Sequence, residues 1–270
     1  MKKESWRRAW QRGNRLIKWL SSLHIGVYAA HTSFFMVLSI FPMLVLLMSL
    51  LRYTGISVDT LMEIVDGIIP LALMGSAKRL ILNTYESSTG TILSLSALTA
   101  LWSASRGIHG LVTGLNAIYR VSENRGYFYT RAFSVVYTFL FLLVLLLTLL
   151  LNIFGNTLLA MFPLEFITKI VDLRTILLLL IQTALFSAIF MVFPNRKNKF
   201  RHSLPGAVFA ALGWMIYTRL YSVYVDHFTG LSSIYGSVYA VALSMLWLYC
   251  CISILFYGGA LNRLLVERKK

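Results

Sequence analysis

The sequence predicts an all-α protein that crosses a membrane several times, because it is strongly apolar and carries little charge. Of its 270 residues, 58% are hydrophobic and only 13% are charged, whereas a soluble domain has about 25% charged residues. The mean hydropathy of +0.73 agrees with this. The composition excludes an ordinary soluble enzyme and a disordered chain. The length fits a single membrane domain over residues 1–270.

Six apolar runs are long enough to cross a bilayer as helices. A helix needs about 20 residues to cross a hydrocarbon layer of ~30 Å, and its backbone groups bond internally where no water is present. We therefore expect six transmembrane helices. They cover residues 27–51, 91–119, 133–154, 175–193, 204–225 and 237–261.

The cations gather on one side of the predicted membrane. Of the 25 Lys and Arg residues, 18 lie in the N-terminal segment, the loops after spans two and four, and the C-terminal tail. Seven of the ten acids lie on the other side. Because basic loops stay in the cytoplasm, we predict that both termini are cytoplasmic. The same sorting explains the net charge of +15 without a nucleic-acid partner.

The N-terminal leader, residues 1–22, has the pattern of an amphipathic helix. One helical side holds Trp6, Trp10, Ile17 and Leu20, while Arg8, Arg12 and Arg15 lie on another. This pattern predicts a surface helix that binds anionic lipids of the cytoplasmic leaflet. A role in membrane orientation alone is an equal and compatible alternative.

The external segment after span one contains two further amphipathic patterns. Residues 61–69 have apolar side chains at i, i+3 and i+4 spacing, and residues 77–82 form a second short apolar stretch. We expect two external helices over the outer mouth of the bundle. They form either a packed lid or a gate.

Span two carries the main functional signal. One helix face holds residues at successive spacings of 4, 3, 4, 3 and 4, namely Trp102, Arg106, His109, Thr113, Asn116 and Arg120. Arg106 lies about 21 Å from Arg120 along the helix, near the bilayer midplane. A charge there costs about 2.5–3.5 kcal/mol, so we expect Arg106 to face a water-filled cavity, a carboxylate or an anionic ligand. The alternative is a structural arginine that caps backbone carbonyls of a broken helix.

Spans five and six complete the predicted cavity. No acid occurs inside any apolar run, whereas Arg106 and Arg219 do, so the cavity attracts anions. Arg219 lies either in the outer half of this cavity or at the interface, where its side chain snorkels to water. Asp226 lies at the outer end of span five, beyond direct reach of Arg219. The uncharged residues 228–236, which include Tyr235, form either a re-entrant turn with free N–H groups or a tight turn packed on the bundle.

Small residues and prolines predict where helices kink and pack closely. Pro42 removes one helical hydrogen bond and kinks span one. Small residues at four-residue spacing allow two helices to approach. The positions assigned to kinks or packing are Pro42, Gly107, Gly110, Gly114, Pro205, Gly206 and Gly236.

The sequence offers little for catalysis. The five His and two Cys residues form no metal-ligand pattern, and no nucleotide-binding or nucleophile motif occurs. No paired carboxylates are available inside the spans for acid–base chemistry. We therefore expect no enzymatic activity, no metal and no cofactor, and the oligomeric state stays open.

Several motifs together resemble one family over nearly the whole chain. They are AAHTSFF at 29–35, LSIFP at 38–42, LWSASRG at 101–107, LNAIY at 115–119, FPN at 193–195, PGA at 205–207, YGS at 235–237, LWLY at 246–249 and GGALN at 258–262. This set resembles the YihY/BrkB family of bacterial inner-membrane proteins, once labelled ribonuclease BN. The resemblance implies a six-helix bundle in the plasma membrane. It also implies a role as a virulence factor or as a transporter of lipid-like or osmolyte substrates.

Three functional hypotheses follow. The first is a transporter or lipid translocator in which Arg106 engages an anionic group, assisted by Trp102, His109, Asn116 and Arg219. The second is a non-transporting scaffold or envelope-integrity factor in which Arg106 is structural. The third, a membrane ribonuclease, is disfavoured because the sequence lacks the His/Asp metal cluster that such an enzyme needs.

Overall fold

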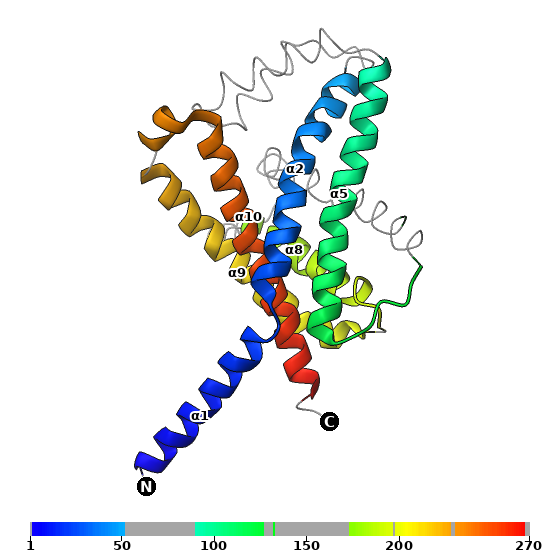
Figure 1. The fold of residues 1–270 in the computed structure, drawn as a ribbon. Helices are drawn as coiled ribbons and strands as arrows, with labels where there is room; N and C mark the ends of the chain where they lie inside the picture. Colours follow the sequence, from blue (N-terminus) through cyan, green and yellow to red (C-terminus); the bar gives the residue numbers. More distant parts are fainter. Residues whose placement is uncertain are drawn as a thin grey trace.

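The computed structural model of the chain describes residues 2–51, 90–126, 132, 173–196, 198–227 and 230–267. These residues form helices and short turns and contain no strand, which confirms the predicted all-α class for this part of the chain. The helices are α1 (Lys2–Ser21), α2 (Ile25–Leu51), α5 (Gly90–Tyr119), α8 (Leu173–Val192), α9 (Phe200–His227) and α10 (Gly230–Glu267) (Figure 1).

The helices coincide with the predicted leader and with five of the six predicted spans. Within the described residues, three helices are long and apolar enough to cross a membrane, over Thr175–Val192, Phe200–Val225 and Val241–Glu267. Ile25–Ser39 is a shorter apolar stretch. The third predicted span, 133–154, and both predicted external helices lie outside the described residues. The architecture is therefore that of a multi-pass helical membrane protein.

The start of α10 corrects one prediction. The turn expected over residues 228–236 is wrong from Gly230 onward, because α10 begins there and Tyr235 and Gly236 lie within it. The prediction of a turn depends on the lack of charge in this stretch and on its glycine and serine residues. Both are favourable at a helix start, and a chain inside a bilayer gains from bonding every N–H group in a helix.

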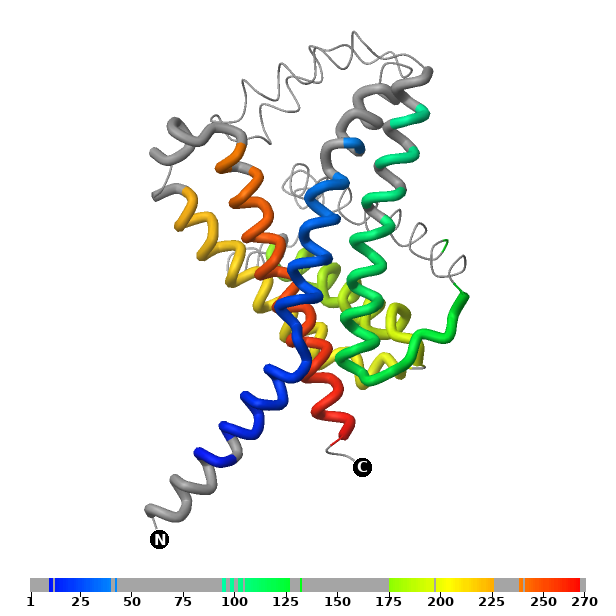
Figure 2. Tube along the Cα trace, viewed as in Figure 1, coloured from blue at the N-terminus to red at the C-terminus, as the bar shows by residue number. Residues whose placement is uncertain are grey.

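The helices pack as two groups that meet at one end of the molecule. α2 packs along α5, while α9 packs against α8 and α10 (Figure 1). α10 also contacts α2 and α5 and so joins the groups. We call the end at which α1 joins α2 and α10 finishes the base. α1 points away from the bundle at the base, as the tube in Figure 2 shows.

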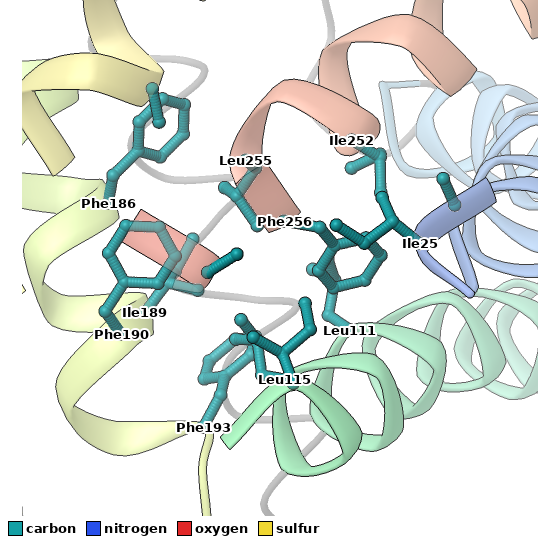
Figure 3. Close-up of a cluster of buried hydrophobic side chains, with 14 of the residues drawn as sticks. Ile25, Leu111, Leu115, Phe186, Ile189, Phe190, Phe193, Ile252, Leu255 and Phe256 are labelled. Atoms are coloured by element: carbon teal, nitrogen blue, oxygen red, sulfur yellow. The ribbon is translucent and has the colours of Figure 1, made fainter. Parts of the chain in front are cut away.

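The hydrophobic core lies at the base. It is formed by the first halves of α2 and α9 and the last halves of α5, α8 and α10. Phe190 and Phe256 are fully buried, and they lie among the aliphatic and aromatic side chains drawn in Figure 3. The opposite halves expose large apolar side chains, such as Leu98 on α5 and Leu220 on α9. The base is therefore the tightly packed part of the described structure, because most of the buried apolar side chains lie there.

A row of glycines lets α5 approach its neighbours closely. A Cβ atom on Gly107 would lie 2.7 Å from Cγ of Met36, and one on Gly114 would lie 2.5 Å from Cζ of Phe256. Gly110 is the tightest position against backbone, because its Cβ would lie 3.2 Å from Cα of Thr32. The spacing of four or fewer residues places all three on one side of α5, where α2 packs.

A second glycine contact joins α9 to α10. A Cβ atom on Gly258 would lie 2.5 Å from the carbonyl oxygen of Gly206, and a Cβ on Gly206 would meet the carbonyl oxygen of Gly258. The two backbones therefore touch directly, as small residues permit in membrane helices. Pro205 precedes this contact inside α9, and Pro42 lies inside α2, which continues through it.

We predict that Gly110→Ala destabilises the protein by about 1–3 kcal/mol, because the added methyl group has no room between α5 and the backbone of α2. The midpoint of thermal unfolding in detergent measures this. Gly13→Ala is the matched control, since nothing lies within 4 Å of a Cβ at that helical position. Equal midpoints for the two variants would contradict a close α2–α5 contact.

Candidate functional site

Arg106 lies on the exposed side of α5, near the middle of this 30-residue helix. Its guanidinium carbon lies 5.1 Å from the ring centroid of Trp102 and 5.6 Å from that of Phe35 on α2. The two rings themselves meet edge to face, with centroids 6.4 Å apart. Aromatic faces attract a cation, and more strongly where water is scarce. α5 and α2 thus supply an aromatic seat for Arg106.

This aromatic seat leaves the charge of Arg106 without a counter-anion in the described structure. No ion pair joins Arg106 to an acid among the described residues. Its side chain is exposed. Two aromatic rings attract the guanidinium but do not neutralise its charge. The arrangement can therefore attract an anionic group.

The structure distributes the other predicted cavity residues over several places. His109 is half-buried on the same side of α5 as Arg106, and its carbonyl oxygen accepts a hydrogen bond from Thr113 Oγ1 at 2.9 Å. Arg219 is exposed on α9, a helix whose main contacts are with α8 and α10. The side chains of Asp226 and Tyr235 lie outside the described part of the structure.

Asn116 belongs to a polar cluster at the base. It is 5% exposed, and its Nδ2 donates to Glu123 Oε2 at 2.7 Å. Its Oδ1 accepts the backbone N–H of Asn195 at 2.7 Å. Arg125 forms an ion pair with Glu123 at 2.7 Å and donates to the carbonyl oxygen of Phe193 at 2.9 Å. We call Asn116, Glu123, Arg125 and Asn195 the base cluster.

The base cluster ties the end of α5 to the turn between α8 and α9. Phe193-Pro194-Asn195 follows α8, and proline stops that helix because it lacks an N–H group. Asn195 Nδ2 donates to the carbonyl oxygen of Ser122 at 3.0 Å, which adds a second link between the turns. Buried polar groups need such partners. The cluster therefore fixes the two helix groups relative to each other.

The ion pair of the base cluster lowers the pKa of Glu123 below its ordinary value. The hydrogen bond from Arg125 is the largest cause, and that from Asn116 acts in the same direction. Partial burial opposes them. Glu123 is thus a carboxylate at neutral pH, in the form that its donors need.

The end of α5 is closed by backbone geometry as well. Arg120 adopts a left-handed conformation with φ of 52°, and the N–H of Val121 donates to the carbonyl oxygen of Asn116 at 2.9 Å. This six-residue hydrogen bond is typical of a Schellman motif, in which glycine usually holds the left-handed position. Arg120 therefore ends the helix rather than extending the side of α5 that holds Arg106.

Two adjacent residues of α10 hold the base from the other side. Asn262 is 2% exposed, accepts the backbone N–H of Gly206 at 2.7 Å and donates to the carbonyl oxygen of Ser203 at 3.0 Å. Arg263, 5% exposed, donates to the carbonyl oxygen of Ile118 at 2.6 Å. A cation at a helix C-terminus interacts favourably with the helix dipole, so Arg263 stabilises the end of α5.

Sequence reasoning missed this role of Arg263, which it counted only among the cations that set orientation. The guanidinium carbon lies 5.6 Å from the ring centroid of Trp19 on α1, and Nε lies 2.7 Å from Glu267 Oε1. The i, i+4 spacing of Arg263 and Glu267 was the available signal, because such pairs face each other on a helix. To use this signal, the prediction would have had to extend the last helix to Glu267 instead of ending it at residue 261.

The chemistry of these sites is that of binding and packing. In the part of the chain that the structure describes, no group of three or more His, Cys, Asp or Glu side chains is placed to hold a metal ion. Cys250 and Cys251 are free thiols in that part. Arg106 and Arg263 lie on aromatic rings, and Arg125 and Arg263 donate to carbonyl and carboxylate oxygens.

Comparisons with known proteins place these features in a family. A family model described as virulence factor BrkB matches residues 16–270. A Bacillus subtilis (strain 168) protein named ribonuclease-like, YfkH, is 32% identical over 92% of this chain and 93% of its own length. A Vibrio vulnificus (strain YJ016) protein named UPF0761 membrane protein is 26% identical over 94% of this chain and 82% of its own. No solved structure matches the chain.

We predict that Glu123→Gln destabilises the protein at pH 7 by about 1–3 kcal/mol, because it removes a charge that holds several hydrogen bonds. The pKa of Glu123 is lowered in the folded state, so its contribution is complete above the ordinary carboxyl pKa. That contribution is lost as the pH falls through the lower folded value. The difference between the unfolding midpoints of the native chain and Glu123→Gln should therefore shrink as the pH falls below the ordinary carboxyl range, about pH 4.

The matched control for Glu123→Gln is Glu267→Gln, which removes another ion-paired carboxylate at the base whose side chain is 55% exposed. Solvent screens the mostly exposed Glu267, although its partner Arg263 is buried, so we expect this control to destabilise the protein less than Glu123→Gln does. A constant difference between Glu123→Gln and the native chain from pH 7 to pH 3 would exclude the ionised Glu123 as its source.

Proposed function

Because the chain belongs to the virulence factor BrkB family of membrane proteins, we propose that it is a plasma-membrane translocator of anionic amphipathic molecules, phospholipids above all. One observation carries the proposal. Arg106 lies in the middle of a long helix on two aromatic rings, with no carboxylate partner among the described residues. Intramembrane cations are rare and costly, and they commonly mark ligand pathways.

The distribution of packing supports movement of a ligand along the half of the bundle opposite the base. The base is closed by the core and the base cluster. The opposite halves of α5, α9 and α10 expose apolar side chains around the level of Arg106 and beyond it. An anionic headgroup on Arg106 with acyl chains along these apolar faces satisfies both surfaces.

The proposal includes six spans with both termini in the cytoplasm. α5 ends at the base with Tyr119, and α8 ends there with Phe193 following it. α8 is 20 residues long, or about 30 Å from end to end. In the proposal, the predicted span 133–154 supplies the remaining crossing between α5 and α8. The basic loops at the base support a cytoplasmic location for the base.

A scaffold or envelope-integrity role is the alternative function. The base cluster supports it, together with Asn262 and Arg263, because these polar side chains bond to neighbouring helices and turns and so hold the bundle together. Under this alternative Arg106 also serves packing, through Trp102 and Phe35. The two functions differ in one respect: only translocation requires a ligand whose binding depends on Arg106.

We predict that purified protein in liposomes moves phosphatidylglycerol with a fluorescent acyl chain between leaflets, and that Arg106→Ala reduces this rate at least tenfold. A charge-assisted hydrogen bond contributes about 1.5–3 kcal/mol, which corresponds to about 10–150-fold. Reduction of the outer-leaflet probe by dithionite measures the exchange. Arg106→Lys should recover part of the rate because it keeps the charge.

The matched control is Arg120→Gln, which removes an exposed arginine from the end of the same helix, away from Trp102. It should exchange lipid as the native chain does. No exchange above protein-free liposomes, with native and Arg106→Ala chains equally folded, would exclude phospholipid translocation and favour the scaffold. Metal-dependent cleavage of RNA by homogeneous protein, at the same rate in the native and Arg106→Ala chains, would favour the activity named for the Bacillus subtilis relative.

A further inference from the structure

α1 packs against the bundle only at its end. Trp19 and Leu20, at its end, pack against the core. Farther out, Trp10 and Ile17 are 76% and 66% exposed. At 100° per residue these two side chains lie within about 20° of each other around the helix. α1 thus presents an apolar side to its surroundings, remote from the bundle in Figures 1 and 2.

A basic side lies next to this apolar side. Residues 2–18 contain seven Lys and Arg residues and a single acid, Glu4. Arg15 and Lys18 are exposed, and with Gln11 and Asn14 they line a shallow hollow of about 280 Å³. The hollow offers cationic and amide donors together, which suits a phosphate group. Neither Arg15 nor Lys18 has an acid partner among the described residues.

The junction with the bundle fixes the position at which α1 ends. Leu23 and Ile25 are buried on either side of His24, which turns the chain with φ of 49°. Trp19 is held beneath the guanidinium of Arg263. The apolar helix α2 begins at once after this turn. Since α2 enters the hydrocarbon layer here, the end of α1 lies at the boundary between that layer and water.

We propose that α1 lies on the membrane surface at the base and binds anionic phospholipid headgroups through its basic side, Arg15 and Lys18 included. Trp10 and Ile17 enter the boundary between headgroups and acyl chains, as amphipathic surface helices do. A second hollow of about 350 Å³ at the junction, between Ile17, His24 and Tyr257, mixes aliphatic and polar walls in the same way. The charge of α1 selects an anionic lipid surface rather than a zwitterionic one. This inference needs only that the chain is a membrane protein and does not depend on translocation.

Hydrogen–deuterium exchange of the full chain in lipid nanodiscs tests the proposal. Amides of residues 10–20 should exchange more slowly in discs with one-third phosphatidylglycerol than in pure phosphatidylcholine. Each basic residue near an anionic surface strengthens attachment about fivefold. The double variant Arg15→Gln, Lys18→Gln should therefore weaken attachment to the anionic discs about 25-fold and reduce the difference in exchange rate between the two kinds of disc. Lys199→Gln with Arg201→Gln, an equal charge change at exposed positions of the base, should keep it.

Exchange at the buried amides of residues 108–115 reports in each sample whether the bundle is folded. A second variant, Trp10→Ser, leaves the bundle contacts of α1 untouched and should lower protection of α1 in both kinds of disc. Equal exchange of α1 in the two lipids would overturn the proposal, and would leave a protein partner as the occupant of this helix. Equal loss of protection in the control pair would overturn the assignment to Arg15 and Lys18.

Discussion

The constraint on which the rest of the structure depends is that helix ends inside or beside a membrane need partners for their backbone polar groups. At the base, three buried side chains supply such partners. Asn116 joins two turns, Asn262 bonds to the backbone of α9, and Arg263 donates to the carbonyl oxygen of Ile118 near the end of α5. Because these groups are buried and bonded at both ends, the helices meet at one register there. The hydrophobic core lies around them, and farther from the base α9 and α10 are joined by other bonds, such as that from the Tyr221 hydroxyl to the carbonyl oxygen of Leu243.

Most of the fold could be predicted from the sequence because apolar length alone specifies membrane helices. The limits of α2, α5, α8 and α9 fall within a few residues of the predicted spans. α10 extends beyond its span at both ends, since glycine and serine at 230–236 and the charged pair Arg263 and Glu267 were interpreted as chain outside the helix. Neither composition nor periodicity reveals that a helix continues when its residues change from apolar to polar. Contacts such as Arg263 with Trp19, 244 positions apart, have no local signal at all.

The candidate site was predictable in part for a similar reason. The spacing of Trp102 and Arg106 places them together, because helical neighbours three or four residues apart face each other. Phe35 joins them from another helix, which required the α2–α5 contact to be known. Asn116 shares the spacing but serves the base cluster. Periodicity gives the side of a helix on which a residue lies and is silent about its partner, and hydrogen-bond partners decide whether a polar residue binds a ligand or closes a helix end.

The contact of Gly206 with Gly258 limits how the two helices are able to move. Backbone touches backbone there, so α9 cannot slide along α10 without parting from it. The amide of Asn262 bonds to Gly206 within the same contact and opposes sliding further. Any sliding of α9 along α10 at the base therefore first requires the two glycine backbones to separate.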